Sequence, residues 1–154
     1  VTVTPDGKQV ISGSFDKTIK VWSLATGLEV ATLVGHSGWV KALAVTPDGK
    51  RLISGSFDNT IKVWSLETER ELFTLNGHTD WVSSVAVTSD GNLVISGSDD
   101  NTLKVWDLET QKVIASFTGE NSLECCAVAA DEVQIIVGEA SGRVHFLKLE
   151  SYNK

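Results

Sequence analysis

The sequence predicts an all-β fold built from about 3.7 copies of one four-stranded unit. Two observations lead to this prediction. VTPDGK stands at residues 3–8 and 45–50 and VTSDGN at 87–92, so the motif recurs at an interval of 42 residues. Between these motifs, segments of four to seven residues rich in Val, Ile and Thr alternate apolar with polar side chains, which is the period of a strand and not of a helix.

Each unit is expected to hold four antiparallel strands, which in the second unit lie at about 39–46, 51–56, 60–66 and 70–75. Asp-Gly pairs follow the first strand, and this dipeptide accepts the positive φ of a tight primed hairpin turn. The pairs are Asp6-Gly7, Asp48-Gly49 and Asp90-Gly91. A second tight turn is expected after each Ser-Gly-Ser motif. It lies at Asp16-Lys17, Asp58-Asn59 and Asp100-Asn101.

The units divide a single segment, residues 1–154, into an incomplete first copy (1–34), two full copies (35–76 and 77–118) and a degenerate fourth (119–154). The fourth copy follows at a step of 41 and places Leu147 on Trp106. Its outer strand is expected to be missing. The sequence has no Met and begins at Val1, so we expect a piece of a longer polypeptide.

The composition indicates which partners, locations and cofactors are disfavoured for this chain. The hydrophobic fraction of 42% suits a packed core, and the net charge of −7 disfavours nucleic acid and anionic membrane surfaces as partners. No apolar run approaches the ~20 residues of a membrane span, and the N-terminus has no features of a signal peptide, which favours a cytoplasmic protein. The two Cys are adjacent, and no phosphate-binding glycine loop or metal motif occurs. We therefore expect no cofactor and no metal.

The repeated Gly-His, Asp-Gly, Ser-Gly-Ser-x-Asp and Val-Trp motifs resemble the WD repeat, although the Trp-Asp pair itself occurs only at Trp106-Asp107. The resemblance implies β-propeller blades of four antiparallel strands. Family rings close with 4 to 8 blades, so about 3.7 blades imply a partial propeller. Either further blades of a parent chain or a second copy, in a homodimeric ring, would complete it.

The resemblance also assigns a structural tetrad to each blade, a buried hydrogen-bond chain from Trp to Ser to His to Asp. The matching residues are Ser12, Asp16 and Trp22 in blade one, His36, Ser54, Asp58 and Trp64 in blade two, and His78, Ser96, Asp100 and Trp106 in blade three. Blade four has Glu120, Val137, Ser141 and Leu147 instead, so its tetrad is lost and we expect it to be the loosest blade.

A Ser-His-Asp set could also act as a catalytic triad. The repetition of the set in every well-matched copy, always with a Trp, argues against that interpretation. Cys125 and Cys126 are interpreted as small buried apolar residues and His145 as solvent-facing. Glu67, Glu69 and Glu71 are interpreted as a solvated outer edge.

The resemblance places partner binding on the top face of the blades, at the start of each first strand and just before each turn Asp. The matching residues are Trp39, Lys41, Trp81, Ser83, Phe15, Phe57 and Asp99, with Ser122, Glu124 and Ala140 as weaker equivalents in blade four. Large exposed aromatic side chains are typical anchors of interfaces. The alternative is that Trp39 and Trp81 pack against each other between blades.

The sequence therefore favours a non-catalytic scaffold or sensor that binds proteins or peptides on its top face. Near-identical repeats of this style resemble those of bacterial, cyanobacterial-type multidomain signalling proteins. A self-assembling module that closes a ring by homodimerisation is the first alternative. An enzyme that uses loops at the central channel is the second, and it would need polar residues unique to one blade.

Overall fold

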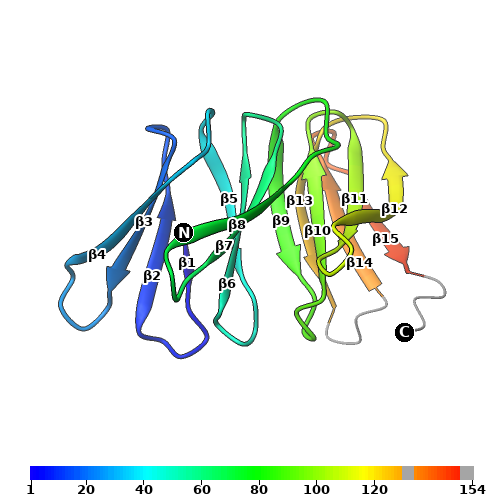
Figure 1. The fold of residues 1–154 in the computed structure, drawn as a ribbon. Helices are drawn as coiled ribbons and strands as arrows, with labels where there is room; N and C mark the ends of the chain where they lie inside the picture. Colours follow the sequence, from blue (N-terminus) through cyan, green and yellow to red (C-terminus); the bar gives the residue numbers. More distant parts are fainter. Residues whose placement is uncertain (130–133, 150–154) are drawn as a thin grey trace.

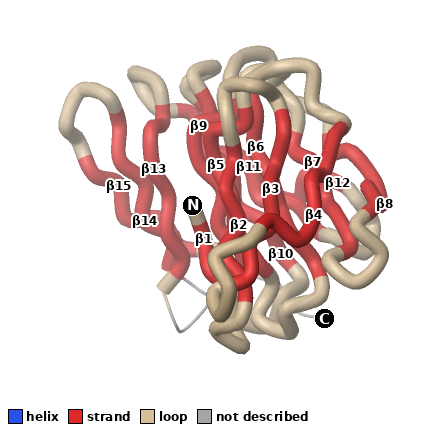
Figure 2. The backbone as a smooth tube through the Cα atoms, turned by 90° about the vertical axis from the view of Figure 1, so that its left-hand side faces the viewer, coloured by secondary structure: helices blue, strands red, loops and turns tan. Residues whose placement is uncertain are grey.

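The computed structural model describes residues 1–129 and 134–149, and these form four antiparallel sheets without any helix (Figures 1 and 2). The first two sheets consist of β1 (Thr2–Val3), β2 (Gln9–Gly13), β3 (Thr18–Ser23), β4 (Glu29–Val34), β5 (Val40–Val45), β6 (Arg51–Ser56), β7 (Ile61–Ser65) and β8 (Arg70–Leu75). The other two consist of β9 (Val82–Val87), β10 (Leu93–Ser98), β11 (Thr102–Asp107), β12 (Lys112–Thr118), β13 (Leu123–Val128), β14 (Gln134–Glu139) and β15 (Val144–Lys148).

Each sheet is a meander in which consecutive strands pair. The sheets, called blades one to four, follow one another in chain order across Figure 1. The neighbouring first strands β5, β9 and β13 lie against one another along one side of this row. The prediction of four strands per unit is confirmed in blades one to three, and the strands of blade two lie within one residue of the predicted bounds. Blade four has three strands within the described residues. The row is open and does not close into a ring.

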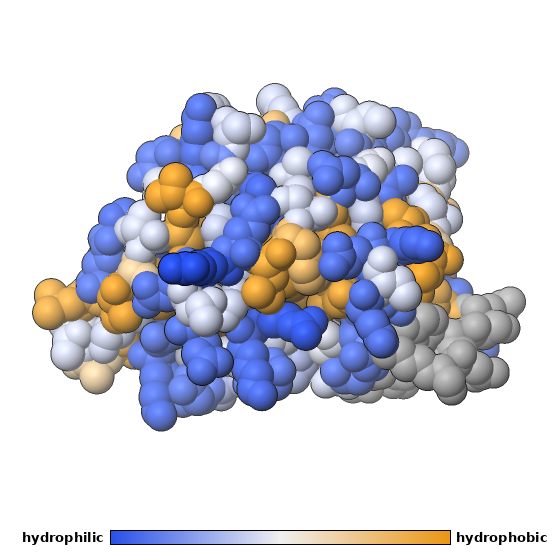
Figure 3. Space-filling model, in the orientation of Figure 1, coloured by the Kyte–Doolittle hydropathy of each residue, from blue (hydrophilic) through white to orange (hydrophobic). Residues whose placement is uncertain are grey.

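Three apolar clusters fill the spaces between neighbouring blades. Ile11, Ile19 and Leu33 of blade one meet Leu52 and Trp64 of blade two in the first cluster. Trp106 of blade three packs in the same way against blade two in the second. Blades two and three thus each bury their third-strand Trp against the blade before them. In the orientation of Figure 1, the remaining surface shows apolar patches separated by polar side chains (Figure 3).

The turns after the Asp-Gly pairs are not primed hairpin turns, so that prediction was wrong. Only the glycines have positive φ, 68° at Gly7 and 70° at Gly49, whereas a primed turn of type I′ needs it at both central residues. Pro5 and Pro47 suit an ordinary type I turn, because the ring fixes φ near −65°, but blade three forms the same turn with Ser89 at that place. The N–H of Gly7 accordingly donates to the Thr4 carbonyl at 2.8 Å. Such a turn leaves the left-handed region to the glycine that follows Asp6.

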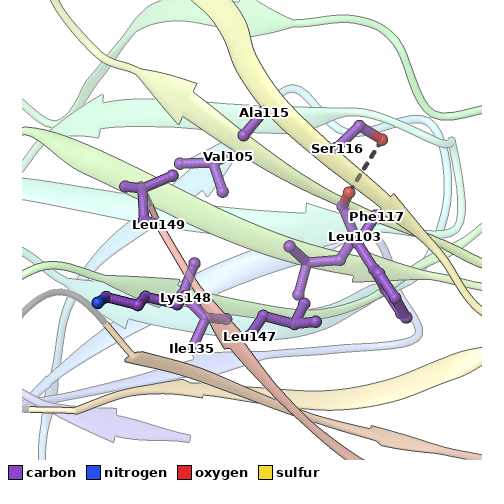
Figure 4. A pocket seen from close by; sticks show the side chains of 9 residues that line it. All are labelled: Leu103, Val105, Ala115, Ser116, Phe117, Ile135, Leu147, Lys148 and Leu149. Carbon is purple, nitrogen blue, oxygen red and sulfur yellow. Dashed lines mark hydrogen bonds between the residues drawn. The ribbon is translucent and has the colours of Figure 1, made fainter. Parts of the chain in front are cut away.

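A groove lies between blades three and four (Figure 4). It has a volume of about 230 Å³. Side chains from β11 and β12, among them Leu103 and Phe117, face Ile135 and Leu147 across it. Leu147 lies where Trp64 and Trp106 lie in blades two and three, and the smaller side chain leaves the space open.

Candidate functional site

Blades two and three each contain a buried hydrogen-bond chain from the third strand to the top of the blade. In blade two, Trp64 Nε1 donates to Ser54 Oγ at 2.8 Å, and Ser54 Oγ lies 2.7 Å from His36 Nε2. His36 Nδ1 lies 2.8 Å from Asp58 Oδ2, which also accepts the backbone N–H of Ser37. The chain therefore ties the loop before β5 to the turn between β6 and β7.

Blade three repeats this geometry with Trp106, Ser96, His78 and Asp100. Burial lowers the pKa of His78, although its hydrogen bond to Asp100 opposes the shift. Because Trp106 donates to Ser96, a neutral imidazole accepts the serine O–H at Nε2 and donates from Nδ1 to Asp100, so each donor in the chain has an acceptor.

Burial alone would raise the pKa of Asp100, but hydrogen bonds from Thr102 and the Thr79 backbone outweigh it and lower the pKa to about 2. The same balance, with His36 and Thr60 as the main donors, holds the pKa of Asp58 well below its ordinary value. Both carboxyl groups are therefore ionised at neutral pH, and they fix the turns that carry Phe57 and Asp99.

The Ser-His-Asp geometry of these chains does not suit nucleophilic catalysis. Ser54 and Ser96 are fully buried, and each already accepts a hydrogen bond from an indole N–H. A substrate could not reach either hydroxyl without displacing the core. In blade one, Trp22 donates to Ser12 at 2.9 Å and Asp16 caps the turn through Thr18. No histidine joins that pair within the described residues.

Blade four replaces the lost tetrad with a carboxylate on a different residue. Buried Glu139 accepts hydrogen bonds from the Ser141 hydroxyl at 2.7 Å and from the backbone N–H of Glu120 at 2.9 Å, and these lower its pKa to about 2. His145 Nε2 lies 3.0 Å from Glu139 Oε1. The expectation that His145 faces solvent was wrong, because the ring turns toward Glu139 and Phe117. Glu139 thus ties the loop before β13 to the β14–β15 turn.

The interpretation of the two cysteines was half wrong. Cys125 is exposed, because it lies on the face of β13 that points away from blade three. Cys126 packs against the cluster between blades three and four, and burial raises the pKa of its thiol to about 11. The three acidic residues Glu67, Glu69 and Glu71 are all exposed, as expected, and Glu71 also pairs with Lys62 at 2.9 Å. Within the described residues, no group of His, Cys, Asp or Glu side chains is arranged to hold a metal ion.

Four aromatic side chains form one stack across the top face of blades one to three; we call Phe15, Trp39, Phe57 and Trp81 the aromatic ladder. The ring centroids are 4.3 Å apart for Phe15 and Trp39, 5.4 Å for Trp39 and Phe57, and 4.1 Å for Phe57 and Trp81. Trp39 and Trp81 therefore do not stack on each other, because Phe57 lies between them. The exposed fractions are 66% for Phe15, 43% for Trp39 and 44% for Trp81.

Backbone hydrogen bonds hold the ladder in place. The N–H of Phe57 donates to the carbonyl of Trp39 at 2.9 Å, and Asp99 and Trp81 make the same bond in blade three. Gly38 allows the first of these contacts, because a Cβ there would lie 2.4 Å from the backbone nitrogen of Asp58. The ladder therefore rests on loops that are bonded to the turns of the blades.

Three of the other predicted top-face residues, Lys41, Ser83 and Glu124, are the extra residues of β-bulges. The register between β5 and β6 shifts around Lys41, that between β9 and β10 around Ser83, and that between β13 and β14 around Glu124. A bulge re-aims the side chain of its extra residue. Lys41 and Glu124 are exposed, and Ser83 donates to Asp99 at 2.6 Å. Ser122 is half-buried, and its carbonyl accepts the N–H of exposed Ala140.

Sequence reasoning missed Lys17, Ser37 and Gly38, which line a hollow of about 300 Å³ beside Trp39, Phe57 and Trp81. A signal was present, because Lys17 and Gly38 depart from the Asn59 and Asp80 that stand at the same places in later repeats. Differences between otherwise matching repeats thus point to the part of the top face that is particular to one blade.

Two comparisons with known proteins found similarity to this chain. A family model described as "WD domain, G-beta repeat" matches residues 1–23, 27–65 and 69–107. The Lissencephaly-1 homolog of Branchiostoma floridae is 51% identical over 37 residues, which make up 24% of this chain and 9% of that protein. The aligned segment therefore covers less than a tenth of the relative's length. Within residues 1–129 and 134–149, no helix is long and apolar enough to cross a membrane.

Proposed function

Because the chain belongs to the WD-repeat family, whose members generally serve as protein-interaction scaffolds, we propose that it is a non-catalytic scaffold that binds proteins or peptides on its top face. The exposed aromatic ladder carries this proposal. Its rings are large and fixed by backbone hydrogen bonds, so a partner gains apolar contact without ordering mobile loops. The close similarity of the first three units supports a host of the bacterial multidomain signalling type. We place the protein in the cytoplasm.

The test is to capture partners with the wild-type chain and with the Trp39→Ser and Trp81→Ser variants from extracts of the cells that make it. The proposal expects partners to be lost while the folded state persists in the melting curve. If the variants only lower the melting temperature and keep every partner, the ladder serves solely to clamp the blades together.

Self-assembly is a second candidate because both ends of the row of blades expose apolar side chains. Val144 and Phe146 are 55% and 76% exposed on the outer face of blade four. Val3 is 50% exposed at the other end, on blade one. Two copies that meet through these faces would bury both sets of side chains.

A further inference from the structure

The aromatic ladder presents ring edges, and not ring faces, along most of its length. Trp39 is stacked between Phe15 and Phe57, and Phe57 between Trp39 and Trp81. The faces of these two middle rings are therefore occupied within the chain. Nucleobases and cationic groups bind aromatic side chains through the ring face, so the middle of the ladder does not suit either of them.

The exposed ring edges favour hydrogen-bond acceptors and apolar groups. The edge of an aromatic ring carries partial positive charge. Trp39 and Trp81 are partly exposed, and their indole N–H groups make no hydrogen bond within the part of the chain that the structure describes. An extended peptide offers carbonyl oxygens to such donors and apolar side chains to the hollow of about 300 Å³.

The charges around the ladder differ between its two ends. Exposed Lys17 lines the hollow, and exposed Lys41 lies on the bulge at the start of blade two. Asp80 and Asp99 flank Trp81, and the backbone N–H of Asp99 donates to the Trp81 carbonyl. Exposed Asp16, whose carboxylate accepts the Thr18 hydroxyl, lies beside Lys17. A partner that lies along the ladder thus meets two lysines and one carboxylate on the side of blades one and two, and two carboxylates at blade three.

We infer that the ladder binds an extended segment of another protein in which an acidic residue, a large apolar residue and a basic residue follow one another. The acidic residue faces Lys17, the apolar residue fills the hollow, and the basic residue faces Asp80 and Asp99. At about 3.3 Å per residue of extended chain, roughly five residues span the four rings. This inference rests on the proposed binding role of the top face and adds the chemistry of the partner.

The test is a selection of random heptapeptides displayed on phage, with the full 154-residue chain as bait. We expect enriched peptides to carry an acidic and a basic residue on either side of a large apolar residue. Synthetic versions should bind the Lys17→Glu variant about tenfold more weakly. Exchange of the peptide's acidic residue for Lys should restore that loss. Lys50→Glu, on the turn between β5 and β6 at the opposite end of blade two, should bind like wild type.

The results that would contradict the inference also show whether the proposed function of the top face fails with it. Peptides of different chemistry that are lost in Trp39→Ser would leave the top face as a binding site but refute the proposed partner. Enriched peptides that bind Lys17→Glu as tightly as wild type would do the same. No enrichment, or enrichment that Trp39→Ser leaves unchanged, would refute both the inference and the proposed function of this face.

Discussion

Glu69 illustrates how a single residue carries backbone strain that its counterpart in blade one avoids, whereas Gln111 of blade three, with φ +59°, shares it. Its φ is +58°, a conformation that costs an ordinary L-residue roughly 1–2 kcal/mol. The matching position in blade one is Gly27, with φ +70°, which adopts this region freely. The strain arises because a residue with a side chain occupies a turn position that glycine adopts freely, so a substitution can remove it.

We predict that Glu69→Gly raises the free energy of unfolding. The relief of the left-handed conformation exceeds the entropy that glycine loses on folding, and the net gain is about 0.5–1 kcal/mol. Chemical denaturation measures it. Thr68→Gly, one residue earlier and without positive φ, should lower the stability instead. Equal effects of the two substitutions would contradict the prediction.

The tetrad of blade three predicts how stability depends on pH. The folded pKa of His78 lies below its ordinary 6.5, and that of Asp100, about 2, lies below 3.8. In both cases the unfolded chain binds protons first as the pH falls, so the stability is fully present above about pH 7. It should decline below pH 6.5 and decline further from pH 3.8 toward 2.

Urea midpoints measured across pH 2–8 test this dependence. The Asp100→Asn variant, which cannot titrate at this position, should be less stable at neutral pH and should show a shallower decline below pH 3.8. A wild-type midpoint that stays constant from pH 8 to 3 would show that neither group is linked to folding.

At the scale of elements, blade four differs from the others through the groove beside Leu147. Trp64 and Trp106 fill the corresponding spaces and donate to Ser54 and Ser96. Blade four has Val137 in place of that serine. An indole placed at residue 147 would therefore fill the groove but leave its N–H without an acceptor.

We predict that Leu147→Phe stabilises blade four by about 0.5–1 kcal/mol, because a larger apolar side chain fills space that is now empty. The double variant Leu147→Trp with Val137→Ser should be more stable than Leu147→Trp alone, because the serine hydroxyl can accept the indole N–H. Hydrogen exchange of β14 amides, compared with those of β10, measures the change and should show the wild-type blade four opening first. Val144→Phe, on the outer face, serves as a control without effect. Faster β14 exchange in Leu147→Phe would mean that the groove cannot accept the ring.

The strands could be predicted from the sequence because period-two patterning and recurring turns act locally. The bulges at Lys41, Ser83 and Glu124 could not, since a pattern of alternating residues does not show where pairing slips by one. The ladder was only half predictable. The repeat positions place Trp39 and Phe57 at the same end of a blade. The alternation of Phe and Trp rings in one stack, however, depends on the backbone geometry of the loops. Glu139 was missed because it lies outside the tetrad positions.

At the scale of the whole molecule, the two ends of the row of blades decide how copies can associate. Phe146 and Val144 project from β15 on the outer face of blade four, and the Trp22 ring of blade one lies only half-buried beneath Lys20. Trp64 and Trp106, by contrast, are covered by the blade before them. A second copy that packed its blade four on blade one would cover Trp22 in the same manner.

We predict that the 154-residue chain associates reversibly and that Phe146→Glu weakens the association. Burial of a phenylalanine side chain contributes about 1.5–3 kcal/mol, so its replacement by a charge should raise the dissociation constant at least tenfold. Sedimentation velocity over a concentration series measures the dissociation constants of the wild-type chain and of the variant. Leu28→Glu replaces an apolar residue of similar exposure in the turn before β4, at the edge strand of blade one, and should leave the association unchanged. A wild-type chain that sediments as a monomer at every concentration would refute self-association through these faces and leave the aromatic ladder as the remaining interaction surface.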